Sequence, residues 1–110
     1  MKAQGTYRNQ TFDLIVINLC HYGDHGDYEL LPSEELDLDL PSLAGTLADH
    51  GCEIEGQSQN TLLLHDDQAI LTIFQTGRMI IENVKPSTFE HAITIGCRMI
   101  QAAGGSFLPR

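Results

Sequence analysis

Three short apolar runs joined by polar turns constrain the fold more than any other feature of this chain. The runs are Thr61–Leu64, Ile70–Phe74 and Met79–Ile81, and they are separated by polar segments at 65–68 and 75–78. The second of these segments contains a glycine. Short runs rich in aliphatic and β-branched residues, joined by such turns, are typical of antiparallel hairpins. This part of the chain therefore predicts a three-stranded meander.

A further strand is predicted well before the meander, at Phe12–Leu19. Its apolar side chains alternate onto both faces, so both faces need cover. One face would carry Phe12, Leu14 and Val16, and the other Ile15, Ile17 and Leu19. A weaker strand is predicted at Cys52–Gln57.

Two helices are predicted, one on each side of the meander. The first begins near Asp39, whose carboxylate can cap the first turn, and Gly51 is a suitable stop. Its apolar residues follow helical spacing at Leu40, Leu43, Ala44 and Leu47. Ser87 and Glu90 form a capping-box pattern that opens a second helix over 88–103. The second helix carries a broad apolar stripe: Phe89, Ala92, Ile93, Gly96, Met99 and Ile100.

These elements predict an α+β fold in the order β-α-β-β-β-β-α. We expect a five-stranded antiparallel sheet with both helices on one face, because two helices cover only one side of such a sheet. Residues 1–110 would form a single domain with its core at about 12–103. Residues 1–10 would be a flexible N-terminus, and 20–38 would be an inserted acidic loop.

The charge of the chain excludes some partners. Fifteen acidic and six basic side chains give a formal net charge of -9. Nucleic-acid binding depends on lysine and arginine neutralising phosphates, so a nucleic-acid partner is disfavoured, and an anionic membrane surface is disfavoured too. The sequence has no apolar run long enough to span a membrane and no signal-like start. Its three widely spaced cysteines favour reduced thiols. We therefore expect a cytoplasmic location.

Possible metal ligands concentrate in one segment, Cys20, His21, Asp24 and His25. Thiolate and imidazole suit zinc, but their spacing here matches no established zinc motif. A solvated loop, or a loop that becomes ordered on a partner, is the simpler interpretation, and we predict no metal. No nucleophile with its base, paired carboxylates or phosphate-binding glycine pattern is present. We therefore expect no enzymatic activity and no cofactor.

Several strings resemble a single repeat of the TATA-box-binding protein family. Residues 38–44 (LDLPSLA) are similar to the family's helix start LDLKTIA, and residues 72–80 (TIFQTGRMI) resemble its hairpin LIFSSGKMV. The segment 18–20 is similar to the end of the family's first strand. The resemblance covers residues 12–103, except for the acidic insertion, which the family lacks. It implies half of a saddle whose concave sheet grips a DNA minor groove.

That family joins two repeats edge to edge through their first strands, and this chain holds only one. The resemblance therefore implies an exposed apolar edge at the first strand, and a homodimer through that edge would cover it. The alternative is a monomer whose edge is blocked by the N-terminal segment or the acidic loop.

The residues that match the family's DNA-contacting face weaken a DNA-binding interpretation. Phe74 matches one of two kinking phenylalanines, Arg78 matches a lysine, and Ile80 matches an apolar groove contact. Gln57, Leu63 and Glu82 replace a phenylalanine, a basic residue and a threonine. A minor-groove binder needs apolar wedges together with cations.

The sequence therefore predicts a small binding module that uses the uncovered sheet face to hold a protein or a small ligand. We expect that face to comprise Phe12, Leu14, Val16, Thr72, Phe74 and Ile80, with Arg78 and Glu82 at its edge. The alternatives are that the acidic loop covers this face, or that the opposite side of the strands is the open one. A DNA-binding dimer and a metal-binding loop are the alternative functions.

Overall fold

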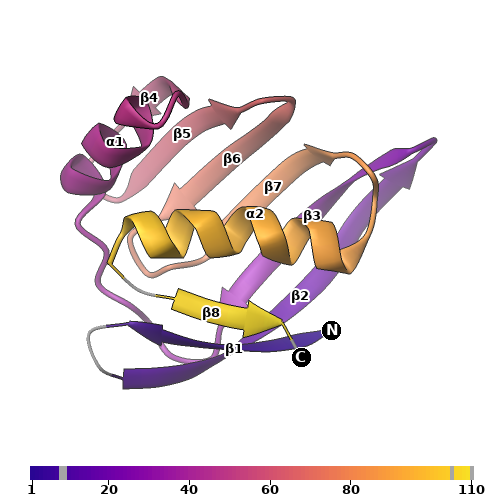
Figure 1. Cartoon of the computed structure of the whole chain (residues 1–110), viewed down its shortest axis with the longest axis horizontal. Helices are drawn as coiled ribbons and strands as arrows, with labels where there is room; N and C mark the ends of the chain where they lie inside the picture. The colour runs from indigo at the N-terminus through magenta and orange to yellow at the C-terminus, as the bar shows by residue number, and fades with distance from the viewer. Residues whose placement is uncertain (8–9, 105, 110) are drawn as a thin grey trace.

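The fold is one antiparallel sheet of eight strands with two helices, as shown by a computed structural model that describes residues 1–7, 10–104 and 106–109. The strands are β1 (Lys2–Tyr7), β2 (Gln10–Tyr22), β3 (His25–Pro32), β4 (Glu53–Gln57), β5 (Thr61–Asp66), β6 (Ala69–Phe74), β7 (Met79–Val84) and β8 (Ser106–Pro109). The helices are α1 (Leu40–Asp49) and α2 (Phe89–Ala102). The strands lie side by side in the order β4-β5-β6-β7-β3-β2-β1-β8 (Figure 1).

The predicted α+β class and antiparallel sheet are confirmed, but the five-stranded sheet in the order β-α-β-β-β-β-α is wrong. Three strands were missed, and the element order is β-β-β-α-β-β-β-β-α-β. Residues 2–7 form β1 rather than a flexible terminus, and they pair with β2 from Tyr7↔Gln10 to Lys2↔Ile15. The second missed strand, β3, lies inside the segment 20–38, which was predicted to be a loop.

The β2–β3 hairpin shows why that loop prediction failed. Acidic residues and glycines suggested solvated chain, yet side chains from Asp27 to Leu30 alternate between the sheet's two faces. Tyr28 and Leu30 are buried, whereas Glu29 lies on the other face. Gly23, with φ of +64°, supplies the left-handed turn between the strands. In Figure 1 this hairpin extends away from the rest of the sheet.

The helices begin close to where the sequence predicts. Asp39 caps α1 by accepting a hydrogen bond from the Ser42 backbone N–H at 3.2 Å, as expected. For α2 the cap is Thr88, whose hydroxyl accepts from the His91 backbone N–H at 3.1 Å. The predicted capping residue, Ser87, instead bonds to side chains of the β2–β3 hairpin.

Both helices cover the same face of the sheet, and the core lies between them and the strands. The strand register places a buried row under the helices: Val16↔Leu30↔Met79↔Ile73↔Leu62. The next row along the strands, Ile17↔Glu29↔Ile80↔Thr72↔Leu63, faces the opposite way. This alternation follows from the two-residue period of a strand, and it leaves one sheet face without helical cover.

We expect Leu64→Ala to lower the free energy of unfolding by about 2–5 kcal/mol, because it deletes a fully buried side chain and leaves a cavity. The matched control is Leu63→Ala on the same strand, since Leu63 is 38% exposed on the other face. That change should cost about 0.5 kcal/mol or less. Urea denaturation of the two variants measures the difference. Equal losses would contradict the assignment of the two faces.

Candidate functional site

The face of the sheet opposite the helices carries four of the six exposed large hydrophobic side chains among the described residues. We call it the open face and define it by Ile15, Ile17, Leu19, Leu31, Leu63, Ile70, Thr72, Phe74 and Ile80. Leu19, Ile15, Ile17 and Leu63 are the most exposed, at 50%, 46%, 39% and 38%. The members on β3, β6 and β7 are half-buried by their neighbours. We therefore take this face as the candidate binding surface.

Three residues predicted for this face lie in the core instead. Phe12, Leu14 and Val16 are only 4%, 3% and 2% exposed and point toward the helices. The prediction was inverted for β2, because this strand is apolar on both sides and its period alone does not say which side the helices cover. The residues that replace them on the open face are Ile15, Ile17 and Leu19.

The five other predicted residues lie on the open face: Thr72, Phe74, Arg78, Ile80 and Glu82. Ile80 and Phe74 are half-buried, and Glu82 is exposed. The Arg78 guanidinium carbon lies 4.9 Å from the centre of the Phe74 ring. The Arg78 Nε also donates to Glu29 Oε2 as part of an ion pair. The cation is therefore already engaged within the face, at its centre.

The family resemblance placed Leu63 on the exposed sheet face, but Leu63 was not included among the predicted binding residues, although a further signal for it exists in the sequence. It is the middle of three consecutive leucines, and in a strand the middle side chain must point opposite to its two neighbours. Leu62 and Leu64 are fully buried, so Leu63 faces away from the core.

The open face carries more acids than bases. By strand alternation, Asp13, Glu29, Glu53, Glu55 and Glu82 lie on it. Among the described residues, the lysines and arginines on this face are Lys2 and Arg78. The Nε2 of His65 lies 3.4 Å from Glu55 Oε1. The face is thus an apolar surface with an acidic rim, apart from the Arg78–Glu29 ion pair, which lies among the apolar side chains.

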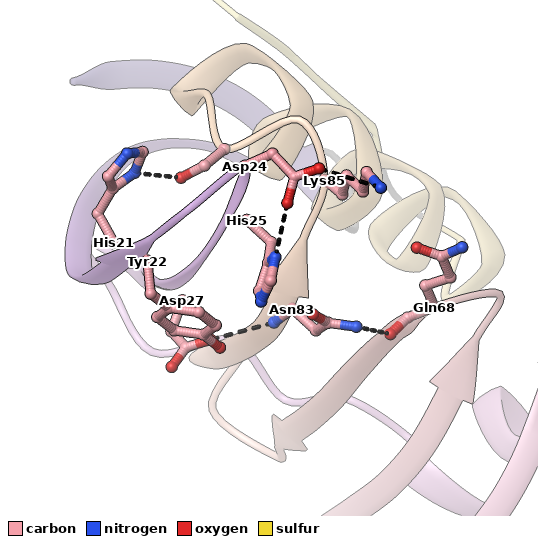
Figure 2. Close-up of polar contacts among 9 residues, drawn as sticks. His21, Tyr22, Asp24, His25, Asp27, Gln68, Asn83 and Lys85 are labelled. Carbon is pink, nitrogen blue, oxygen red and sulfur yellow. Dashed lines mark hydrogen bonds and ion pairs between the residues drawn. The ribbon is translucent and has the colours of Figure 1, made fainter.

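The predicted metal candidates lie in the β2–β3 hairpin and form separate contacts (Figure 2). Cys20 is an exposed free thiol. His21 Nδ1 lies 2.9 Å from Ser87 Oγ, and Asp24 Oδ1 lies 2.9 Å from His25 Nδ1. In the part of the chain that the structure describes, no three histidine, cysteine or carboxylate side chains are grouped to hold a metal.

Ser87 fastens this hairpin to the start of α2. Its hydroxyl is 2.9 Å from both His21 Nδ1 and the Tyr28 hydroxyl, and its backbone N–H donates to the Asp24 carbonyl oxygen. Gly26 leaves the necessary room, because a Cβ there would lie 2.4 Å from Ser87 Oγ. The serine–histidine contact therefore has a structural role, which is to hold two distant segments together.

A second set of contacts links the hairpin to the end of β7. The Tyr22 hydroxyl donates to Asp27 Oδ1 at 2.9 Å, and this hydrogen bond raises the pKa of Tyr22. The same carboxylate oxygen accepts from the Asn83 backbone N–H at 3.0 Å. Asn83 has a φ of +62°, and its side chain donates to the Gln68 carbonyl oxygen (Figure 2).

The edge predicted to form a homodimer is largely occupied. The predicted first strand lies within β2, which pairs with β1 on one side and with β3 on the other. On the β1 side, the Val16 N–H donates to the Met1 carbonyl oxygen at 2.8 Å. Both segments that the sequence offered as cover pair with this strand: the N-terminal segment from Gln10 to Val16, and the segment 20–38, as β3, on the other side.

Comparisons with known proteins identify no family for this chain. No family model, no curated protein and no solved structure matches it. The resemblance to the TATA-box-binding protein therefore stays a prediction, and its expected exposed first strand is not found. Neither helix in the described part of the chain has the length and apolar character needed to cross a membrane.

We expect the Asp24 carboxyl to titrate near pH 2. Hydrogen bonds from His25 and then Lys85, with the Lys85 charge, lower its pKa from 3.8 to about 2. Because the folded value is lower, these contacts stabilise the fold above pH 3.8, and that contribution is lost as pH falls through about 2. Carbon-detected NMR titration of the Asp24 carboxyl measures the midpoint. Asp24→Asn should remove this pH dependence, and a midpoint near 4 in the native protein would contradict the contacts.

We expect Gly26→Ala to destabilise the protein by about 1–3 kcal/mol, because the added methyl group overlaps Ser87 Oγ and the Cys20 carbonyl oxygen. The control is Gly45→Ala on the exposed side of α1, where a Cβ meets nothing within 4 Å. That change should stabilise the helix by about 0.5–1 kcal/mol. Thermal unfolding compares both variants. If Gly26→Ala left the stability of the protein unchanged, the hairpin would not be held against α2 in this way.

Proposed function

We propose that this protein is a non-catalytic binding module that holds another protein against its open face. The observation that carries the proposal is the exposure of Ile15, Ile17, Leu19 and Leu63 on one side of a continuous sheet. Covering these side chains would remove apolar surface from water, at about 25 cal/mol for each Å² buried. The half-buried Ile80 and Phe74 extend the same surface across the central strands.

The organisation of the face suits a protein partner. Apolar side chains with polar and charged ones around them are the usual arrangement of a protein–protein interface, and here one ion pair, Arg78–Glu29, lies among the apolar side chains. The rigid backbone of neighbouring strands holds these side chains at fixed positions. The ion pair between Arg78 and Glu29 is already formed, so the partner need not supply a counter-charge for either group.

The charge of the face indicates what kind of partner fits. The acids on the rim outnumber the lysines and arginines that the structure describes there, and the whole chain has a formal net charge of -9. Electrostatic complementarity favours a partner whose apolar patch is flanked by lysine or arginine. Two copies of this chain packed face to face would bring excess negative charge together, which opposes self-association through this surface.

The same charges argue against the DNA-binding alternative. Phosphate contacts need free cations, whereas Arg78 is paired with Glu29 and lies over the Phe74 ring. Glu82 and Asp13 on the same face would repel a phosphate backbone. Phe74 is also half-buried rather than projecting as a wedge between base pairs.

Site-specific photo-crosslinking in cells of the source organism tests the proposal. A photoreactive phenylalanine analogue at Ile17 should crosslink to a heavier protein that is rich in lysine or arginine. The matched control places the analogue at Thr94, which is exposed on α2 and faces away from the open face. The yield of the adduct should fall when salt is added. No adduct should form when Leu63→Glu is combined with the probe at Ile17.

Two results would contradict this proposal. Equal crosslinking from Ile17 and Thr94 would show that the open face is not a preferred surface. An adduct of twice the chain mass would identify a second copy as the occupant and exclude the basic partner.

A further inference from the structure

A second candidate site lies on the helix side of the sheet, away from the open face. A cavity of about 480 Å³ is lined by Thr46, Leu47, His50, Cys52, Asp66, Arg98, Met99, Gln101 and Ala102. These residues come from the end of α1, the segment that joins α1 to β4, the end of β5 and the last turns of α2. The volume falls within the range of about 300–1,000 Å³ that small-molecule sites occupy. We propose that this cavity binds a small primary amine with an apolar body.

The apolar part of such a ligand has a matching wall. Leu47 and Met99 are 3% and 2% exposed, so they present the edge of the core to the cavity. Ala102 adds a small apolar side chain at the end of α2. An apolar wall with a few polar groups is the usual composition of a ligand site.

The electrostatics of the cavity favour a cation. The final turns of α1 and α2 both line it, and the C-terminal end of a helix carries a partial negative charge. Neither helix has a basic residue in its last turn to offset that charge. Arg98 Nη2 donates to Asp66 Oδ2 at 2.6 Å, so Arg98 balances the Asp66 carboxylate and leaves the two helix ends uncompensated. The net charge of -9 adds a long-range attraction for cations.

The hydrogen-bonding groups also suit an amine donor. His50 Nδ1 lies 2.7 Å from the Thr46 carbonyl oxygen, which can only accept, so Nδ1 carries the proton. In the neutral ring, Nε2 is then an acceptor. The Asp66 carboxylate is a second acceptor at the cavity, and its side chain is only 18% exposed.

Cys52 is not expected to react with the ligand. Burial, and then the charge of Asp66, raise the pKa of its thiol. The thiol is therefore protonated at neutral pH, and it contributes a polarisable wall rather than a nucleophile. The cavity is a binding site and not a catalytic one.

Amide NMR titration with 2-phenylethylamine tests the proposal. Saturable shifts are expected at Leu47 and Met99 below about 10 mM, where a ligand with a Kd near 1 mM is mostly bound. The neutral analogue 2-phenylethanol and the anionic 3-phenylpropionate, which keep the apolar body, should bind at least fivefold more weakly. Absence of saturable shifts with the amine would overturn the proposal, as would equal binding of the anion.

Two matched variants separate this site from general attraction to an acidic protein. Asp66→Asn should weaken amine binding at least fivefold, whereas Glu29→Gln should not change it. Both carboxylates are paired with an arginine, but Glu29 lies on the open face. Ala102→Leu should block binding by filling the cavity, even if Asp66→Asn disturbs the local fold. Equal weakening by Glu29→Gln and Asp66→Asn would show non-specific attraction and refute the site, and it would leave the proposed function of the open face unaffected.

Discussion

The structure depends on the fact that its two helices cover only one of the two faces of its sheet. Two helices lie on an eight-stranded sheet, and both lie on the same side. In the central strands β2, β3, β5, β6 and β7, the two-residue period then separates the side chains that the helices bury from those that they do not. The contrast between Leu62 and Leu63, neighbours in one strand, shows how sharp this division is. The open face and the core are therefore two consequences of the same geometry.

The β2–β3 hairpin changes what the sheet can do. Its second strand, β3, lies between β7 and β2, and β1 then pairs with much of the other side of β2. Edge pairing between copies, which the sequence suggested, is thus largely replaced by pairing within the chain. At the same time the hairpin adds Ile15, Ile17 and Leu19 to the open face. The exposed apolar surface is therefore not the edge of β2, as the sequence suggested, but the open face to which β2 contributes.

The polar contacts of the hairpin explain why an acidic, histidine-containing segment is folded. Ser87 bonds to His21 and Tyr28, and Asp27 accepts from Tyr22 and from the Asn83 backbone. From the sequence, His21 was a candidate metal ligand and the acidic segment around it was expected to be a solvated loop. In the structure these side chains instead join the hairpin to the beginning of α2 and the end of β7. Their partners are distant in the sequence, so no local pattern reveals the pairing.

Local sequence patterns alone determined much of this protein: the α+β class, the meander, the Asp39 cap and the positions of both helices. Each depends on residues within a few positions of one another, where capping, turn chemistry and periodicity act. The face of β2 was decided only by tertiary structure. Because that strand is apolar on both sides, its outward side was set by where α1 and α2 pack and by the register with β3. The cavity between the helix ends likewise exists only after distant segments meet, since none of its walls is a motif by itself.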